Sequence, residues 1–404
     1  MRLAIFYKSV TARHNLIISM ILLGFLAGCV SGSVPVDMDL NPESLRSAVA
    51  QIQTIPATPT SIMELPVILS TEPVHLQPRL IPTNSPVPKP QPTPTEIPPP
   101  IFSDVKFYTG IEPVAYLSNT CQYIYDRWKP DSSQPGTIVV PIMYHGIRRE
   151  GGTVTDNITV TEGYFHKTMN HAYELGYETI TIAEFIDFLN ENKRIPPRSL
   201  LLIIDDRRLG TVKEHFLPVL EDYDWTLVMA YITGVMNAQE WADAKNVLAT
   251  GLVEMEGHGY LHNGATYITE FTTEETMIQE IYNPIKAFLE NLGYRPRAFI
   301  WPGGNFNEKA VTIAREAGYE IGFTVHSRGP VMFNWIPQGQ VERTIGDPLL
   351  MLPRYWSTKA FDSLDDAATI GENARAYAFN QREEEFAWYH MNCKAYPPLD
   401  FPQP

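Results

Sequence analysis

The sequence is short of basic residues. Its 404 residues include 31 lysines and arginines against 46 aspartates and glutamates, which gives a formal net charge of -15 and a pI of about 5.1. Nucleic-acid binding needs a basic patch that neutralises phosphates, and no such patch stands out. Nucleic acid is therefore excluded as a partner, and an uncharged or partly cationic substrate is favoured.

The N-terminal apolar run is too short to cross a membrane comfortably. Residues 16–26 follow a basic stretch, whereas a membrane span needs about 20 apolar residues. This layout is typical of a secretory signal. The run ends in Leu26-Ala27-Gly28-Cys29, which resembles the lipobox of bacterial lipoproteins, so that Cys29 would carry the lipid. An uncleaved anchor helix is the alternative, and both interpretations place the remaining chain outside the cytoplasm, at the bacterial cell membrane.

Cysteine is scarce, with three in the whole chain. Once Cys29 is assigned to the signal (residues 1–29), only Cys121 and Cys393 remain, in a compartment that permits disulfides. We expect them to form a bridge, whose loop of roughly 270 residues is worth about 4–5 kcal/mol in the chain-entropy model. Two buried free thiols are the alternative.

Proline is concentrated in residues 30–100, which are also rich in Thr and Ser. Proline fixes φ and removes a hydrogen-bond donor, so neither helix nor sheet propagates through the densest part. We interpret this segment as a semi-extended tether that could span roughly 200 Å at about 3.1 Å per residue. Residues 101–404 are then the folded domain.

In the folded domain, short apolar runs alternate with amphipathic stretches of helix length, which indicates an α/β fold with parallel strands. The predicted strands are Thr137–Tyr144, Leu200–Ile204, Thr226–Tyr231, Val253–Met255, Ala298–Trp301 and Ile321–Thr324. The predicted helices are Glu162–Leu175, Ile182–Asn192, Thr211–Tyr223, Ala238–Ala249, Thr273–Leu292 and Glu308–Ala317.

Chemically capable residues follow several of the predicted strands. In parallel α/β folds, sites gather where strands end and helices begin, so these residues should converge on one face. They are His145, the pair Asp205-Asp206, His258 with His262, and the turn Pro302-Gly303-Gly304-Asn305.

The two histidines and the aspartate pair fit a metal site. His258 and His262 are four residues apart, a spacing that places two side chains on one face of a helical turn. One carboxylate of Asp205-Asp206 would complete a set of two histidines and one aspartate, which suits Zn²⁺. The other carboxylate would be free to act as a base toward water at the metal.

Several segments resemble the polysaccharide deacetylase family, carbohydrate esterase family 4, and most closely its poly-N-acetylglucosamine deacetylase branch. The resemblance runs from about Pro141 to Arg354, with its motifs in order. They are Met143-Tyr144-His145, Ile203-Ile204-Asp205-Asp206, His258-Gly259-Tyr260-Leu261-His262, Phe299-Ile300-Trp301-Pro302-Gly303, Ala314 to Thr324, and Leu352-Pro353-Arg354.

The resemblance implies a distorted (β/α) barrel that hydrolyses N-acetyl groups of an extracellular or cell-wall polysaccharide of the N-acetylglucosamine type. Asp206, His258 and His262 would bind the metal, which would be zinc, with cobalt or nickel as alternatives. Asp205 would be the general base.

Further roles follow from the same resemblance. Arg354 would orient Asp205 and lower its pKa, unless it is a surface arginine, and a backbone N–H near Gly303 would help to hold the oxyanion. We expect four residues at the substrate, namely His145, Trp301, Pro302 and Arg207. His145 could equally be a core histidine, and Trp301 a core aromatic.

The sequence departs from the family pattern at three places. Arg207 replaces the glycine after the aspartate pair, Ile203-Ile204 replaces Thr-Phe, and Gly259 replaces Ser or Thr. The late general-acid histidine has no clear match, with His326 and His390 as candidates. Two alternative functions therefore stay open: a catalytically impaired carbohydrate-binding module, and a metal-dependent hydrolase of another amide or ester.

Overall fold

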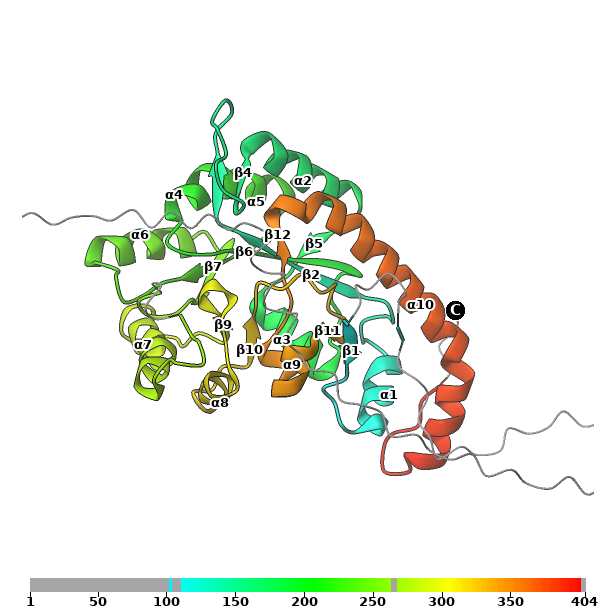
Figure 1. The fold of residues 1–404 in the computed structure, drawn as a ribbon. Helices are drawn as coiled ribbons and strands as arrows, with labels where there is room; N and C mark the ends of the chain where they lie inside the picture. Colours follow the sequence, from blue (N-terminus) through cyan, green and yellow to red (C-terminus); the bar gives the residue numbers. More distant parts are fainter. Residues whose placement is uncertain (1–101, 104–109, 263–266, 401–404) are drawn as a thin grey trace, which may run out of the picture. The chain divides into compact units, whose positions relative to one another are not determined.

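The computed structural model describes residues 102–103, 110–262 and 267–400, which are drawn as coloured ribbon in Figure 1. The predicted signal peptide (1–29), Cys29 and the whole of the Pro-rich segment (30–100) lie outside the described residues. Within the described part, no helix combines the length and the apolar character that crossing a membrane requires.

The described chain alternates strands and helices. The strands are β1 (Glu112–Val114), β2 (Ile138–Tyr144), β3 (Gly146–Arg148), β4 (Thr159–Thr161), β5 (Glu178–Thr179), β6 (Arg198–Ile204), β7 (Leu227–Tyr231), β8 (Val253–Gly257), β9 (Ala298–Ile300), β10 (Ile321–Phe323), β11 (Ile336–Gln338) and β12 (Tyr355–Trp356). The helices are α1 (Thr120–Trp128), α2 (Glu162–Glu174), α3 (Ile182–Glu191), α4 (Leu209–Thr211), α5 (Leu217–Tyr223), α6 (Ala238–Leu248), α7 (Glu274–Leu292), α8 (Glu308–Glu316), α9 (Gln340–Ile345) and α10 (Ala360–Asn392).

The central sheet has the strand order β10-β9-β8-β7-β6-β2-β12, with β5 beside β6, and every neighbouring pair is parallel. The two edges of the sheet meet through one short segment. Leu352 pairs with Phe323 of β10, and the same segment continues into β12, which pairs with β2. The sheet therefore curls into a distorted (β/α) barrel, as the sequence predicts (Figure 1).

The strands form a barrel because both of their faces are apolar. All seven residues of β2 are buried, and six of the seven in β6. Val139, Leu201 and Ile203 belong to one cluster that also takes residues from β7, β9 and β10, so this cluster fills the barrel interior. The alternate residues, such as Val140 and Leu202, pack outward against the helices. Strands buried on both faces are typical of parallel sheets.

Local caps set where several helices begin. Thr181 with Glu184, and Asn237 with Glu240, form capping boxes at the first turns of α3 and α6. Asn307 caps α8, because its side chain accepts the backbone N–H of Ala310. Such caps satisfy N–H groups that have no partner within the helix.

The predicted strands are all present, with ends shifted by two residues at most. The predicted helix Thr211–Tyr223 is the least regular, because residues Val212–Phe216 form a π-helical turn between α4 and α5. Only α4 separates this turn from the Asp205-Asp206 loop, and π-turns inside helices often occur beside functional sites.

The longest helix, α10, covers one side of the barrel. It packs against α2, β2 and α1 and is drawn orange to red in Figure 1. Its C-terminal cap, Cys393, forms a disulfide with Cys121 of α1, with Cα atoms 5.5 Å apart and a separation of 272 positions in sequence. The predicted bridge is therefore confirmed.

Candidate metal centre and active site

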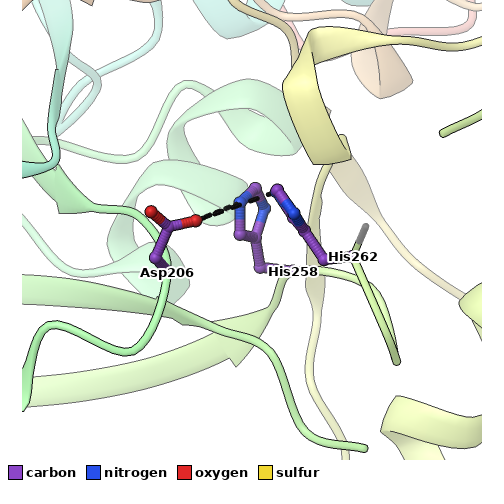
Figure 2. Close-up of side chains that lie close together, drawn as sticks. All are labelled: Asp206, His258 and His262. Atoms are coloured by element: carbon purple, nitrogen blue, oxygen red, sulfur yellow. Dashed lines mark ion pairs between the residues drawn. The ribbon is translucent and has the colours of Figure 1, made fainter. Parts of the chain in front are cut away.

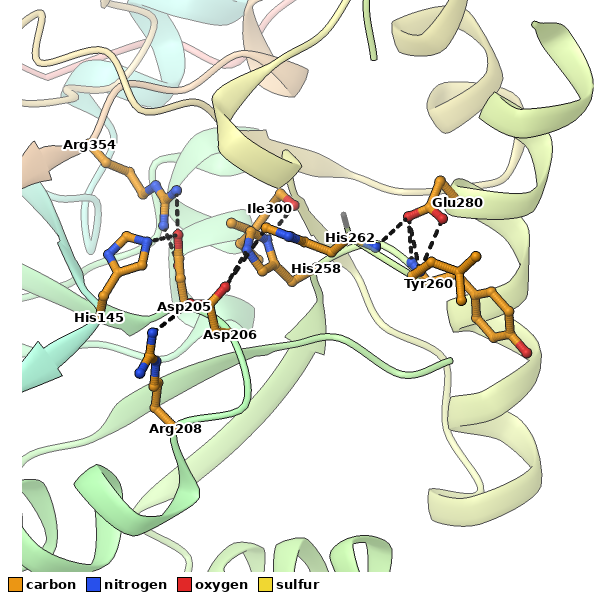
Figure 3. A network of polar contacts seen from close by, with 11 residues as sticks. His145, Asp205, Asp206, Arg208, His258, Tyr260, His262, Glu280, Ile300 and Arg354 are labelled. Carbon is orange, nitrogen blue, oxygen red and sulfur yellow. Dashed lines mark hydrogen bonds and ion pairs between the residues drawn. The ribbon is translucent and has the colours of Figure 1, made fainter. Parts of the chain in front are cut away.

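The candidate site lies where the barrel strands end at their carboxyl termini. His145 follows β2, Asp205 follows β6, His258 follows β8, and Arg354 lies in the segment that closes the barrel. The Asp205 N–H donates to the carbonyl of Tyr144 at 2.8 Å, which fixes the ends of β2 and β6 together. The expected convergence of these side chains is confirmed (Figure 3).

Asp206, His258 and His262 form a cluster that could hold a metal ion, with one ligand atom from each within 4.8 Å of the others. Figure 2 shows the two imidazoles facing the aspartate. The Nε2 atoms of both histidines lie 3.8 Å from Oδ1 of Asp206. Tetrahedral zinc with bonds of about 2.0–2.2 Å would place its ligand atoms about 3.4 Å apart, so the spacing fits.

The ring of His258 is prepared as a metal ligand. Its Nδ1 lies 2.9 Å from the carbonyl oxygen of Ile300, and a carbonyl can only accept, so Nδ1 carries the proton. This leaves the lone pair on Nε2 facing Asp206. Burial, together with the neighbouring His262, lowers the pKa of His258 to about 4 in spite of the nearby carboxylates, so the imidazole is neutral at neutral pH.

His258 and His262 are brought together by a loop and not by the expected helical turn. His258 and His262 lie in the loop after β8, where Gly259 has φ +71° and His262 has φ +44°. The left-handed residues curl this loop so that the ring centroids lie 4.4 Å apart. The helical argument from the four-residue spacing was therefore wrong, although the pairing that it predicted is present.

Asp205 and Arg354 form a buried ion pair beside this cluster. Arg354 donates from Nη1 to Oδ1 at 2.6 Å and from Nη2 to Oδ2 at 2.9 Å, and its Nε donates to the carbonyl of Thr324. Their exposed fractions are 2% and 0%. Burial alone would raise the pKa of Asp205, but Arg354, with His258 and His145, outweighs it and holds the pKa at about 2. The alternative that Arg354 is a surface residue is thus excluded.

His145 lies on the open side of the same carboxylate. Its Nε2 is 3.8 Å from Oδ2 of Asp205, and the side chain is 15% exposed. Its Nδ1 is buried and has no hydrogen-bond partner within the described part of the chain. Of the two interpretations that the sequence left open, a residue that lines the site is favoured over a core histidine that satisfies backbone groups.

The two arginines after the aspartate pair lie differently. Arg207 donates from Nη1 to the carbonyl of Val235 and to Oε1 of Glu240, so it ties the site loop to the first turn of α6. Arg208 donates to Oδ2 of Asp206 at 3.2 Å, the oxygen that the histidines leave free (Figure 3). Asp206 itself takes the left-handed conformation, with φ +70°.

The turn after β9 borders the metal cluster, but its tryptophan does not reach the substrate. Trp301 is fully buried, and its Nε1 donates to the carbonyl of Leu350 at 2.7 Å, so the expectation that it contacts a sugar was wrong. Pro302 is buried too, and Gly303 is exposed, with φ +61°. The expected role of the Gly303 backbone N–H in holding an oxyanion stays a prediction.

Sequence reasoning missed two residues that support the cluster. The ring of Tyr267 packs edge-on against His262, with centroids 5.2 Å apart. The carboxylate of Glu280 accepts backbone N–H groups from residues 260–262. A charged residue on the otherwise apolar face of α7 is the sequence signal that could have pointed to Glu280. His326 and His390, the late general-acid candidates, make no contact with Asp205 within the described residues.

A family model described as polysaccharide deacetylase matches residues 192–322. These residues are therefore similar to a polysaccharide deacetylase domain. The matched residues hold the aspartate pair and both metal-cluster histidines, whereas His145 and Arg354 lie outside them.

Curated relatives of this domain include a poly-β-1,6-N-acetyl-D-glucosamine N-deacetylase of Staphylococcus aureus (strain MSSA476), which is 23% identical over 185 residues. That alignment covers 43% of this chain and 63% of the relative. A putative polysaccharide deacetylase of Bacillus subtilis (strain 168), YxkH, is 22% identical over 186 residues, with 45% and 63% covered. The chain thus spans somewhat less than two thirds of the length of these relatives.

Solved structures similar to the polysaccharide deacetylase domain include the Streptococcus pyogenes deacetylase PplD in complex with acetate. It is 18% identical, covers 58% of this chain and 99% of its own, and has a TM-score of 0.47. The structure of IcaB from Ammonifex degensii is 19% identical, covers 60% and 100%, and has a TM-score of 0.44.

Proposed function

We propose that this protein is a metal-dependent N-deacetylase of a polysaccharide that contains N-acetylglucosamine. One observation carries the proposal: a cluster of two histidines and one aspartate lies beside a second, ionised aspartate that Arg354 holds in place. A purely structural metal site would not need a free carboxylate next to its ligands. The name of the Staphylococcus aureus relative supports an N-acetylglucosamine polymer as the substrate class.

Asp206, His258 and His262 would hold the ion, which we take to be zinc because nitrogen and carboxylate ligands suit it. When bound, a divalent ion supplies Lewis-acid activation of water and of the acetamide carbonyl. Oδ2 of Asp206 accepts a hydrogen bond from Arg208, and Oδ1 is the oxygen that lies toward both histidines.

Asp205 acts as the general base. Because its pKa is about 2, the carboxylate is ionised at neutral pH and accepts the proton of the attacking water. Arg354 contacts both oxygens and keeps the carboxylate plane fixed, so the proton-accepting lone pair stays oriented toward the cluster. A backbone N–H near Gly303 would stabilise the oxyanion that forms on the acetamide.

His145 is our candidate for the general acid. The hydrolysis breaks the C–N bond of the acetamide, and the leaving amine must gain a proton. His145 is partly exposed beside Asp205, with its Nε2 3.8 Å from Oδ2 of that carboxylate. This role is sharper than the substrate contact that the sequence predicted for His145.

The test is acetate release from chito-oligosaccharides and from poly-β-1,6-N-acetylglucosamine by zinc-loaded protein. Asp205→Asn should lower kcat about 10²–10⁴-fold, the usual contribution of a general base, without loss of zinc. His258→Ala should lose zinc and activity together. If zinc-loaded wild type releases no acetate yet binds the glycan, the protein is a binding module and the proposal is wrong.

We also propose that the protein is anchored outside the cytoplasm by a lipid on Cys29, with residues 30–100 as its tether. The support is the lipobox-like sequence alone. Cys29→Ser should move the protein from the membrane fraction to the soluble fraction, as followed by fractionation and immunoblot. Unchanged membrane association would count against lipidation.

A further inference from the structure

The two metal-cluster histidines are held in different ways. The ring of His258 is fixed by its hydrogen bond to the carbonyl of Ile300. Within the described residues, no hydrogen bond reaches the ring of His262. Apart from ring packing against Tyr267 and His258, the orientation of His262 therefore depends on its backbone, which has the left-handed φ of +44°. A non-glycine residue in this region persists only when its surroundings hold it there.

Glu280 of α7 supplies that hold. Its Oε2 accepts the N–H of Tyr260 at 2.9 Å and of His262 at 3.3 Å, and its Oε1 accepts the N–H of Leu261 at 3.0 Å (Figure 3). Three successive N–H groups thus converge on one carboxylate, which is an anion nest made by the loop itself.

The burial of Glu280 is costly unless these bonds serve a purpose. The side chain is 2% exposed and lies on the face of α7 that otherwise buries Met277, Ile281 and Phe288. Within the described part of the chain, no lysine, arginine or histidine pairs with Glu280. A buried carboxylate without a cation needs full hydrogen bonding, and glutamate is rarely this buried unless it is paired. Such a local conflict with the fold is expected at functional positions.

Gly259 makes room for this carboxylate. A Cβ at position 259 would lie 2.8 Å from Oε2 of Glu280 and 2.7 Å from Cγ of Pro302. The position where the family pattern has Ser or Thr is therefore empty of side chain here, and the carboxylate from α7 occupies the adjacent space. Gly259 and Glu280 form a matched pair.

We infer that Glu280 is a positioning residue for the metal centre, which fixes the backbone of residues 260–262 so that His262 faces Asp206 before a metal binds. The inference rests on the proposed metal site and goes beyond it, because it assigns the orientation of one ligand to a residue that touches neither metal nor substrate. Residues that orient metal ligands typically contribute 10- to 100-fold in metal affinity.

The experiment measures zinc affinity by competition with a chelator, in wild type, Glu280→Gln and Glu280→Met. The matched control is Glu290→Gln, an exposed glutamate on the same helix. We expect both Glu280 variants to bind zinc at least tenfold more weakly, and the control to stay within twofold. The melting temperature of the metal-free protein is measured in parallel. Glu280→Gln keeps an amide oxygen that can still accept from the loop, so its metal-free stability should stay closer to that of wild type than that of Glu280→Met, which leaves three N–H groups without an acceptor.

A double-mutant cycle separates positioning from a general structural effect. If Glu280 acts through His262, Glu280→Gln should cause no further loss of zinc affinity in a His262→Ala background. An equal loss in both backgrounds, or a single variant within twofold of wild type, would overturn the inference.

The visible spectrum of the Co²⁺-loaded protein gives a second readout, and Glu280→Gln should change its intensity because one ligand is displaced. None of these measurements requires deacetylation. Wild type that binds zinc but releases no acetate therefore refutes the proposed function alone, whereas wild type that binds no zinc refutes both.

Discussion

At the scale of single residues, the chemistry depends on two aspartates that are adjacent in sequence but differ in surroundings. Asp205 is buried against Arg354, whereas the side chain of Asp206 is 22% exposed and faces the two histidines. The carboxylate with the fixed arginine is suited to stay ionised as a base, and the one facing imidazoles is suited to bind a cation. The geometry agrees with the roles that the resemblance implies.

The Asp205–Arg354 pair predicts a large stability effect. Arg354→Met leaves a buried carboxylate without its cation, which should lower the free energy of unfolding by about 3–5 kcal/mol at pH 7. Urea denaturation of the metal-free protein measures this loss. The double variant Asp205→Leu/Arg354→Met should recover most of it, and a double variant as unstable as the single one would contradict the account.

The loss of unfolding free energy in Arg354→Met should depend on pH, because the ion pair requires an ionised Asp205. The pKa of Asp205 is lowered from 3.8 to about 2, so its ionisation stabilises the fold above pH 4, and this contribution disappears as the pH falls through about 2. The difference between wild type and Arg354→Met should therefore shrink as the pH falls from 4 toward 2.

The variant Arg207→Gly tests whether an arginine, in place of the glycine of the family pattern, weakens the metal site. Its guanidinium pairs with Glu240 and does not contact the cluster within the described residues. Arg207→Gly should thus leave zinc affinity within about twofold of wild type, as measured by chelator competition. A tenfold change would show that the arginine acts on the centre through the loop.

The site residues that sequence patterns predict are those that follow strands directly. Asp205, Asp206 and His258 were predictable because apolar strands precede them and their spacing is local. Only its charge on the otherwise apolar face of α7 marks Glu280, and its role was not predictable, because its partners are backbone groups about 20 residues away and leave no residue-type pattern. Trp301 is a wrong prediction of the other kind. It follows a strand beside the site, but its side chain is buried in the core and cannot contact a sugar.

At the scale of elements, strand β8 leads into His258 of the metal cluster and also carries two glutamates, Glu254 and Glu256. Glu254 and Glu256 alternate with the outward-packed Val253 and Met255, so they point into the barrel. Glu256 accepts the N–H groups of Arg297 and Ala298, and Glu254 accepts that of Ile182. Burial raises the pKa of both carboxyls, and that of Glu254 reaches about 7.

The raised pKa of Glu254 predicts how the free energy of unfolding varies with pH. A pKa raised in the folded state gives stability that is complete below about pH 4.5 and is lost as the pH rises through 7. Glu254→Gln should flatten the decline in unfolding free energy between pH 5 and 8, as measured by urea denaturation. The exposed control Glu290→Gln should keep the decline of wild type, and an unchanged slope in Glu254→Gln would contradict the assignment.

Helix α10 shows why one element could not be predicted. Its buried face contains many small residues, including Ala367, Gly371, Ala374 and Ala378, so apolar contrast along the helix is low. The small residues permit close packing: a Cβ at Gly371 would lie 2.9 Å from the carbonyl oxygen of Gly136, just before β2. The sequence pattern does not predict whether this segment covers the barrel, because such packing is a tertiary property.

At the scale of the whole molecule, the Cys121–Cys393 bridge joins the two ends of the described fold. The pairing was predictable because only Cys121 and Cys393 remain once Cys29 is assigned to the predicted signal, which implies a compartment that permits disulfides. The barrel closure through residues 352–356 was not, since it depends on pairing of only a few residues with strands more than 25 positions away along the chain.

The bridge closes a long loop, so Cys121→Ser/Cys393→Ser should lose about 4–5 kcal/mol in the chain-entropy model. Thermal melting of the oxidised wild type against the variant measures this loss. Zinc affinity should stay the same, because α1 and α10 do not contribute to the metal cluster. An unchanged melting temperature would show that α10 is held by its packing alone.

The central claim is that Asp206, His258 and His262 hold one divalent ion that the deacetylase reaction requires. The most direct measurement is the rate of acetate release from an N-acetylglucosamine oligosaccharide as zinc is titrated into metal-stripped protein. We expect no release without metal, a linear rise up to one equivalent and a plateau beyond it. Release that is independent of zinc, or absent at every ratio, would contradict the claim.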